Sequence, residues 1–274
     1  MKRPAQIVAI RGAGDLASGA ALRLWRSGYR VILSELAVPL CVRRSVSFAN
    51  AVFEGQTKVE EAECALISDP AEADHFWEKD RIPLMIDPSG AEILSFQPDV
   101  LVDGRMIKIH QEEPHCSDAP LVIGLGPGLL AGTNVHAVVE TNRGHDLGRV
   151  LWHGEAEPDT GMPGTIQGEA LKRVVKAPCA GAFQPQVAIG DTVQAGDRIA
   201  MVGDTPVYAQ LAGMVRGVLY PGSQVEKTLK IMDIDPRGKR EYCFSVSDKA
   251  NAVGGGVLEA ILTWSARGSA GIRY

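Results

Sequence analysis

Short apolar runs alternate with polar or glycine-rich segments along the first 170 residues of the chain. The first run ends at Ile10, a glycine turn follows, and Leu22, Leu24 and Trp25 then continue at helical spacing. Further short runs lie at 29–34, 64–67, 83–86, 100–102, 121–123 and 135–140. Buried parallel strands have such runs, and helices usually connect them. The pattern predicts an α/β fold whose first part is a Rossmann-like, mainly parallel sheet.

Between residues 171 and 236 the pattern changes to short strands separated by glycine turns, and it repeats. Gly181 recurs as Gly213, and Ile199 recurs as Ile231, each pair 32 residues apart. Two copies of one β unit predict a small all-β barrel. The amino-acid sequence of 177–181 resembles that of barrel-sandwich-hybrid domains of the biotinyl and lipoyl kind. Those carriers hold their cofactor on a hairpin lysine, and the hairpin 202–207 has none, so we expect no swinging-arm carrier.

A C-terminal helix is expected after Ser247, with Val253, Val257 and Trp264 on one face, and it returns the chain to a core. Its glycine run, 254–256, is unfavourable by about 1 kcal/mol per glycine relative to alanine, so close backbone packing or the approach of a ligand must compensate, and we favour packing. We therefore predict three parts: a Rossmann-like nucleotide- or cofactor-binding domain over 1–170, a barrel-sandwich-hybrid-like domain over 171–240, and a helix within 241–274 that packs on the first domain.

Composition and charge exclude some classes of function. The chain has 274 residues, of which 45% are hydrophobic, enough for two ordinary cores. Its net charge of -5 argues against nucleic acid as a partner. The longest uncharged stretch, 119–135, is broken by glycines and a proline, so no membrane span is expected. Five cysteines without a C-x-x-C pair predict free thiols and a cytoplasmic protein.

The sharpest chemical signal is the turn after the first apolar run. It matches the G-x-G-x-x-G/A spacing of dinucleotide-binding loops, in which the backbone approaches a pyrophosphate at a helix N-terminus. An acid follows the second run about 20 residues later, where such sites contact a ribose. The residues predicted to contact the cofactor are Gly12, Gly14, Asp15, Leu16, Ala17, Ser18, Gly19 and Glu35. The alternative is a tight turn beside a solvated acid.

Asp15 complicates this interpretation, because a carboxylate repels phosphate unless a metal ion or Arg11 offsets its charge. Three glycines after a later run, Gly124, Gly126 and Gly128, are predicted at the same edge of the sheet. Glycine also serves ordinary turns, so this assignment has an equally simple alternative.

Cys41 precedes Arg43 and Arg44, which would favour its thiolate and could bind phosphate. The alternative is a small buried side chain beside two solvated arginines. His145 follows another apolar run and is either a general acid, an anion contact or part of a polar turn. The segment 109–116 gathers His, Glu and Cys without regular ligand spacing, so we favour a surface loop and predict no metal site.

Several segments of the sequence are long and unusual in composition. They are 11–19, 43–48, 124–128, 140–145, 161–164, 233–237, 247–250 and 254–259. Together they resemble the accessory proteins of the selenium-dependent molybdenum hydroxylase system, the YqeB-type family, over nearly the whole chain. The resemblance implies a role in maturing molybdenum hydroxylases, with the hydroxylase apoprotein and selenium-delivery proteins as partners. The first domain also resembles the Rossmann part of chaperones that sulfurate molybdenum cofactor for xanthine dehydrogenase.

Our leading hypothesis is that the loop holds a dinucleotide form of molybdopterin. Cys41 would accept or relay selenium, and Arg43, Arg44 and Lys108 would contact the anionic cofactor. The chain departs from the family pattern directly after Lys108. One alternative is an NAD(P)-dependent oxidoreductase, although no tyrosine and lysine pair at helical spacing accompanies the loop. Another is a non-catalytic scaffold whose barrel docks the hydroxylase. The sequence leaves open whether the protein catalyses a reaction and which oligomeric state it adopts.

Overall fold

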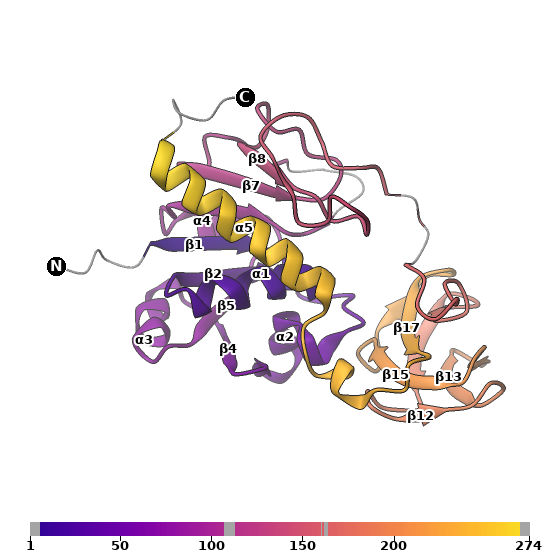
Figure 1. Cartoon of the computed structure of the whole chain (residues 1–274). Coiled ribbons are helices and arrows are strands. Elements are labelled where there is room, and N and C mark those ends of the chain that lie inside the picture. The colour runs from indigo at the N-terminus through magenta and orange to yellow at the C-terminus, as the bar shows by residue number, and fades with distance from the viewer. Residues whose placement is uncertain (1–5, 107–112, 160, 162–163, 269–274) are drawn as a thin grey trace. The chain divides into compact units, whose positions relative to one another are not determined.

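The computed structural model describes residues 6–106, 113–159, 161 and 164–268, and it contains two compact units (Figure 1). The first unit consists of residues 1–39, 48–159 and 246–274, and the second of residues 40–47 and 160–245. The predicted boundaries assigned 40–47 to the first domain, whereas the structure groups this segment with the second unit. Among the residues described, no helix is long and apolar enough to cross a membrane.

A nine-stranded mixed sheet forms the centre of the first unit, in the order β3-β4-β5-β2-β1-β6-β7-β8-β9. Its strands are β1 (Ile7–Arg11), β2 (Arg30–Glu35), β3 (Gln56–Val59), β4 (Ala62–Ile67), β5 (Ile82–Ile86), β6 (Val100–Asp103), β7 (Leu121–Leu125), β8 (Ala137–Val139) and β9 (Val150–Leu151). Neighbours from β4 to β8 are parallel, while β3 and β9 pair antiparallel at the two edges.

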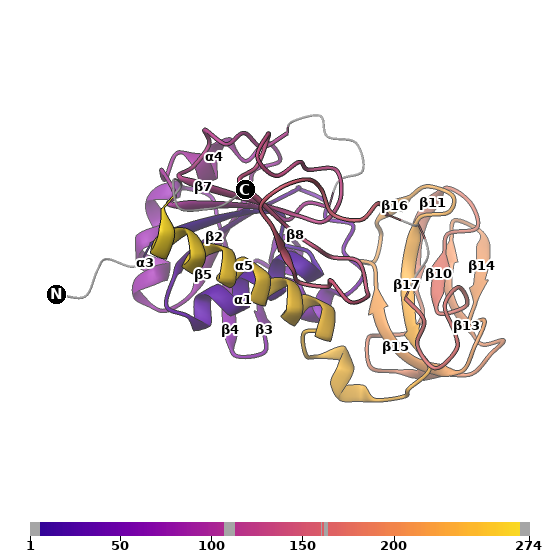
Figure 2. The same cartoon turned by 45° about the horizontal axis from the view of Figure 1, so that its top comes forward.

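The α-helices of this unit are α1 (Asp15–Arg26), α2 (Ala51–Glu54), α3 (Ala73–Glu78), α4 (Ala91–Leu94) and α5 (Asp248–Arg267). Short 3-10 helices lie at Phe48–Asn50 and Pro70–Glu72. The long C-terminal helix α5 runs along α1 (Figures 1 and 2). A Cβ atom on Gly19 would lie only 2.7 Å from the Ala250 Cβ, and one on Gly254 only 2.7 Å from the Gly19 carbonyl oxygen. Glycine on both helices therefore permits their close approach.

The fold class that we predicted is wrong. A Rossmann sheet places the strand that follows β2 directly beside it, in the order 3-2-1-4-5-6. Here the chain leaves β2, forms the antiparallel pair β3 and β4 at an edge, and only then inserts β5 between β4 and β2. Apolar runs show which segments are strands, but strand order depends on contacts between segments far apart in sequence, which the runs do not encode.

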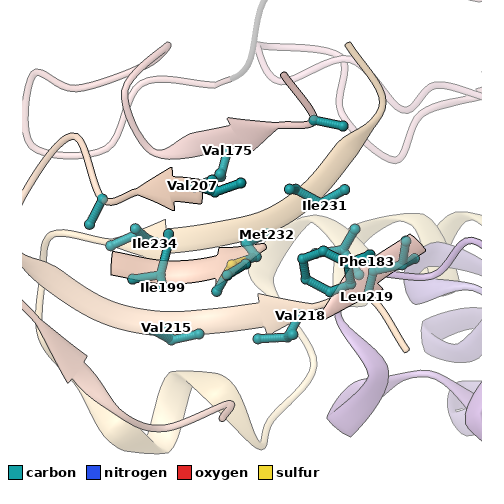
Figure 3. Packing of buried hydrophobic residues seen from close by; sticks show 14 of the residues in the cluster. Val175, Phe183, Ile199, Val207, Val215, Val218, Leu219, Ile231, Met232 and Ile234 are labelled. Atoms are coloured by element: carbon teal, nitrogen blue, oxygen red, sulfur yellow. The ribbon is translucent and has the colours of Figure 1, made fainter. Parts of the chain in front are cut away.

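The second unit is built from two four-stranded antiparallel sheets, with the orders β10-β17-β15-β12 and β14-β13-β11-β16. Its strands are β10 (Val174–Lys176), β11 (Gly181–Pro185), β12 (Thr192–Val193), β13 (Arg198–Val202), β14 (Thr205–Tyr208), β15 (Gly213–Val218), β16 (Gln224–Val225) and β17 (Lys230–Asp235). The unit also has 3-10 helices at Arg44–Val46 and Arg240–Cys243. Side chains from both sheets, including Phe183, Ile199, Val215 and Ile231, share one buried cluster (Figure 3).

The 32-residue repeat has a structural counterpart, because the shift carries β10 to β14, β11 to β15, β12 to β16 and β13 to β17. It also carries one sheet onto the other, so each copy contributes two strands to each sheet. The prediction of a barrel-sandwich-hybrid domain is nevertheless corrected, because the structure describes this unit as two separate four-stranded antiparallel sheets. A repeat in sequence identifies equivalent strands, but it does not specify which strands pair across the two copies.

Candidate functional site

The loop between β1 and α1 lies at the carboxyl ends of the parallel strands, where ligands bind in many α/β sheets. Gly12 has a φ of +90°, which disfavours other residues, and its amide donates a hydrogen bond to the Ser34 carbonyl at 2.8 Å. A Cβ atom there would also lie 3.2 Å from the Arg105 backbone. Glycine at this position is therefore required both by the turn and by a close backbone contact.

Gly14 is the N-cap of α1, and it provides no side-chain hydrogen bond to the helix. The first amides of a helix lack intrahelical acceptors, and they form the positive end of the helix dipole. Among the described residues, a Cβ atom on Gly14 would meet no atom within 4 Å apart from its own chain neighbours. The start of α1 is thus open and positively polarised, and it can accommodate an anion such as phosphate.

Glu35, at the end of β2, supports this loop directly. One carboxylate oxygen accepts a hydrogen bond from the Ala13 amide and the other accepts one from the Leu36 amide, both at 2.8 Å. Burial raises the pKa of the Glu35 carboxyl, and the two amide hydrogen bonds oppose that shift. Each oxygen retains a further lone pair, so the ribose contact stays a prediction.

The remaining loop residues divide into an inward-facing and a partly exposed group. The buried Ser18 hydroxyl donates to the Ala13 carbonyl at 2.9 Å and accepts from the Phe48 amide at 2.8 Å. Ala17 is buried as well, and Gly19 contacts α5. Asp15 and Leu16 are partly exposed. Of the residues predicted to contact the cofactor in this loop and helix start, 14–16 are therefore the partly exposed ones, and they are the ones that a ligand can contact.

The sequence suggested Arg11 as an offset for the charge of Asp15, and the described contacts of Arg11 are with Ser89 and Asp103. It is almost completely buried, donates to the Ser89 carbonyl, and lies 3.9 Å from the Asp103 carboxylate. Asp103 in turn binds Arg105 through several hydrogen bonds, the shortest at 2.6 Å. This buried group of charges stabilises the strand ends beneath the loop.

Lys249, in the first turn of α5, is a residue that the sequence analysis missed. Its side chain is partly buried. Burial lowers the pKa of the Lys249 ammonium and Arg143 lowers it further, while Asp15, Asp159 and Glu140 oppose the shift. The available signal was a cation in the first turn of a predicted helix, where the helix dipole disfavours positive charge.

The three later glycines have local structural roles. A Cβ atom on Gly124 would collide with Leu129, and one on Gly126 would lie 2.6 Å from the Thr141 hydroxyl. Gly126 and Gly128 also have φ values of +73° and +92°. These observations explain the glycines as turn and packing residues, and they leave a contact with cofactor as a prediction.

His145 is exposed on the loop that follows β8. Two residues before it, Arg143 pairs with the Asp248 carboxylate through hydrogen bonds of 2.6 and 2.8 Å. Lys108 lies outside the described residues, as does the first half of the neighbouring segment 109–116, which is rich in His and Glu. Among the residues that are described, no cluster of three or more His, Cys, Asp or Glu could hold a metal ion.

Cys41, Arg43 and Arg44 belong to the second unit, so the structure does not combine them with the β1–α1 loop in one unit. The Cys41 thiol donates to the Ser47 hydroxyl at 3.0 Å. Arg43 is buried and contacts two backbone carbonyls of 242–245 at 3.4 Å. Arg44 donates to the Val218 carbonyl at 2.8 Å. Both arginines thereby attach the segment 40–47 to the second unit.

These features define a two-unit α/β protein with a glycine loop at the carboxyl ends of the parallel strands in its main sheet. No protein-family model matches the chain. It is 47% identical over 257 residues to the Escherichia coli (strain K12) protein described as "Uncharacterized protein YqeB". This identity supports its assignment to the YqeB-type family. The match covers 94% of this chain and 47% of the relative, so the chain spans about half the length of that protein.

Solved structures with similarity to the chain include a product-bound ectoine utilization protein EutE (DoeB) from Ruegeria pomeroyi, at 12% identity and a TM-score of 0.25. Another is an aspartoacylase family protein from Mesorhizobium loti, at 13% identity and a TM-score of 0.27. Each match covers 84% of this chain and 85% of the other. Neither is described as a molybdenum-cofactor or selenium maturation protein. Scores this low establish no shared activity.

Proposed function

We propose that the first unit binds a phosphate-bearing nucleotide on the loop between β1 and α1. The observation that carries this proposal is the combination at Gly12 and Gly14: a tight glycine turn followed by a helix start with no side-chain cap, where a Cβ atom would meet no atom of the described residues within 4 Å. The amides there can donate to phosphate oxygens, and Glu35 supports the loop from below. Residues 14–16 would contact the ligand directly.

In its finer form, the proposal is that the chain is an accessory protein in the maturation of selenium-dependent molybdenum hydroxylases. The nucleotide would be a dinucleotide form of molybdopterin, held as cargo and passed to the hydroxylase apoprotein after selenium-delivery proteins have acted. The sequence segments that resemble this family motivate the role. The similarity to YqeB supports membership of the family, and the description of that relative assigns it no role. The loop suits the diphosphate of such a ligand, and the molybdenum that the ligand carries would supply the position for selenium.

Cys41 is the thiol that we propose as selenium acceptor. Cys41, Cys116 and Cys179 are partly exposed, and of these three only Cys41 has arginines within three residues of it in the sequence. His145 is exposed and remains a proposed anion contact or general acid. We also propose a cytoplasmic location, because all five cysteines are free and thiols persist in reducing compartments.

Calorimetric titration of the purified chain with pyrophosphate, CDP, ADP and NAD⁺ tests the nucleotide proposal. Gly14→Glu and Gly14→Gln form a matched pair, because a Cβ atom at this position meets no described atom within 4 Å, the two side chains are nearly equal in size, and only the first adds a negative charge. We expect the native chain and Gly14→Gln to bind, and Gly14→Glu to bind roughly tenfold more weakly or worse. No binding by the native chain, or equal binding by both variants, would refute the proposal.

The maturation role is tested by producing a selenium-dependent molybdenum hydroxylase with the native chain, with Cys41→Ser or without the chain. We expect the selenium content and activity of the hydroxylase to fall without the chain and with Cys41→Ser. Full maturation in the absence of the chain contradicts the role, and full maturation with Cys41→Ser contradicts the thiol step alone. Binding of NAD⁺ together with an absorbance change at about 340 nm on reduction of the cofactor would favour an oxidoreductase instead.

A further inference from the structure

Lys249 carries a positive charge at a position that the fold disfavours in three ways. It lies in the first turn of α5, where the helix dipole repels a cation. Its side chain is partly buried, which removes water from the ammonium. Arg143 also lies close enough to lower its pKa further. Within the part of the chain that the structure describes, the ammonium forms no salt bridge that would compensate.

The carboxylates around Lys249 offset these penalties only in part. Asp15, Asp159 and Glu140 all favour its charged form, yet burial and Arg143 together outweigh them. Glu140 already accepts hydrogen bonds from the Asn142 amide at 2.6 Å and the Glu157 amide at 2.8 Å. A lysine retained for stability alone would be expected to pair closely with one of these groups.

The packing of α5 on α1 explains why Lys249 is close to the loop. The neighbouring Ala250 contacts Gly19, one turn after the start of α1, and Gly254 contacts Gly19 from the following turn. The first turns of the two helices therefore lie side by side, with Asp15 on one and Lys249 on the other. Lys249 is accordingly a cation near Asp15, a role that the sequence suggested for Arg11.

We propose that Lys249 binds a phosphate group of the ligand held on the β1–α1 loop, a contribution that rests on the proposed function. The ammonium donates charge-assisted hydrogen bonds to the phosphate oxygens, and these replace the close partner that it lacks. It also offsets the repulsion between phosphate and the Asp15 carboxylate. The chemistry recognised is pyrophosphate, whether alone or within a nucleotide.

Binding of sodium pyrophosphate, CDP and ADP to the full chain tests this assignment by calorimetry. The variants are Lys249→Met, Lys249→Arg and the control Lys79→Met, which removes the same charge from an exposed position in the first unit. We expect Lys249→Met to weaken pyrophosphate binding roughly ten- to a hundredfold, Lys249→Arg to restore most of the loss, and Lys79→Met to bind normally. Equal weakening of CDP and ADP would assign the contact to their shared diphosphate.

A Lys249→Met variant that binds within about twofold of the native chain overturns the assignment and leaves the proposed function intact. Absence of binding by the native chain overturns both. Thermal unfolding without ligand separates binding from folding, because removal of a partly buried, unpaired charge should leave the midpoint unchanged or higher. As a direct readout, NMR titration of ¹³C-methylated lysines should show the Lys249 pKa rising when pyrophosphate is added; an unchanged pKa contradicts the contact.

Discussion

The glycine run in α5 gives a test of the helix packing with its control in the same turn. Gly254 and Gly255 are adjacent in one helix, but a Cβ atom on Gly254 would lie 2.7 Å from the Gly19 carbonyl oxygen, while one on Gly255 would meet no atom within 4 Å. Alanine favours the helix over glycine by about 1 kcal/mol at either position. We therefore expect Gly255→Ala to stabilise the first unit by about 0.5–1 kcal/mol.

Gly254→Ala receives the same gain in helix propensity but forces a methyl group against backbone that has little freedom to move. Overpacking of this kind costs about 1–3 kcal/mol, so the variant should be neutral to destabilised by about 2 kcal/mol. The difference between the two alanine variants is then roughly 1–3 kcal/mol. For a unit of this size it corresponds to roughly 2–12 °C in the unfolding midpoint.

Differential scanning calorimetry measures the midpoints, and hydrogen exchange of the α5 amides assigns the change to that helix. Gly254→Ala should accelerate exchange in α5, and Gly255→Ala should slow it. Equal shifts for the two variants would show that the contact with Gly19 does not limit the approach of the helices.

Two further predictions concern the first unit. The His136 Nδ1 atom accepts a hydrogen bond from the Val122 amide at 2.9 Å, and burial lowers the pKa of the imidazole. The unfolded chain therefore binds the proton more tightly, and stability present above a pH of about 6.5 should fall as the pH drops below it. Urea unfolding at two pH values should show a smaller loss for His136→Asn, and an equal loss would contradict this cause. Ser18→Ala leaves the buried Phe48 amide without its acceptor and should destabilise the protein by about 1–3 kcal/mol in the same assay. Substitution of the exposed Ser27 by alanine is the control and should have a smaller effect. Equal effects of the two substitutions would contradict the bridging role of Ser18.

Local features at the start of the chain were predictable from the sequence. The apolar run, the glycine turn and the helical spacing correctly predicted β1, the loop and α1. The position of Glu35 at the end of the second strand was also predictable, because the apolar run ends there. Since the two strands are parallel, their carboxyl ends lie on the same side of the sheet, and Glu35 lies near the loop after the first strand. Its hydrogen bond to the Ala13 amide was not, since that contact depends on the course of the loop.

Predictions that depended on distant contacts were less successful. Cys41, Arg43 and Arg44 follow the second strand closely, so proximity in sequence suggested proximity to the loop. The segment 40–47 instead belongs to the second unit, where the Arg44 guanidinium donates to the Val218 carbonyl. Lys249 was missed for the opposite reason, because it lies more than two hundred residues after the glycine turn. Only the packing of α5 along α1 brings Lys249 close to that turn.

By itself, the sequence determined the local strand, turn and helix around Gly12 and Gly14, because backbone freedom and apolar spacing act within a few residues. It also determined the 32-residue repeat of the second unit. Only the tertiary structure decided that β5 inserts between β4 and β2 and that Lys249 lies beside Asp15. Strand order and the proximity of charges of this kind depend on the packing of segments far apart in the chain, which no local pattern records.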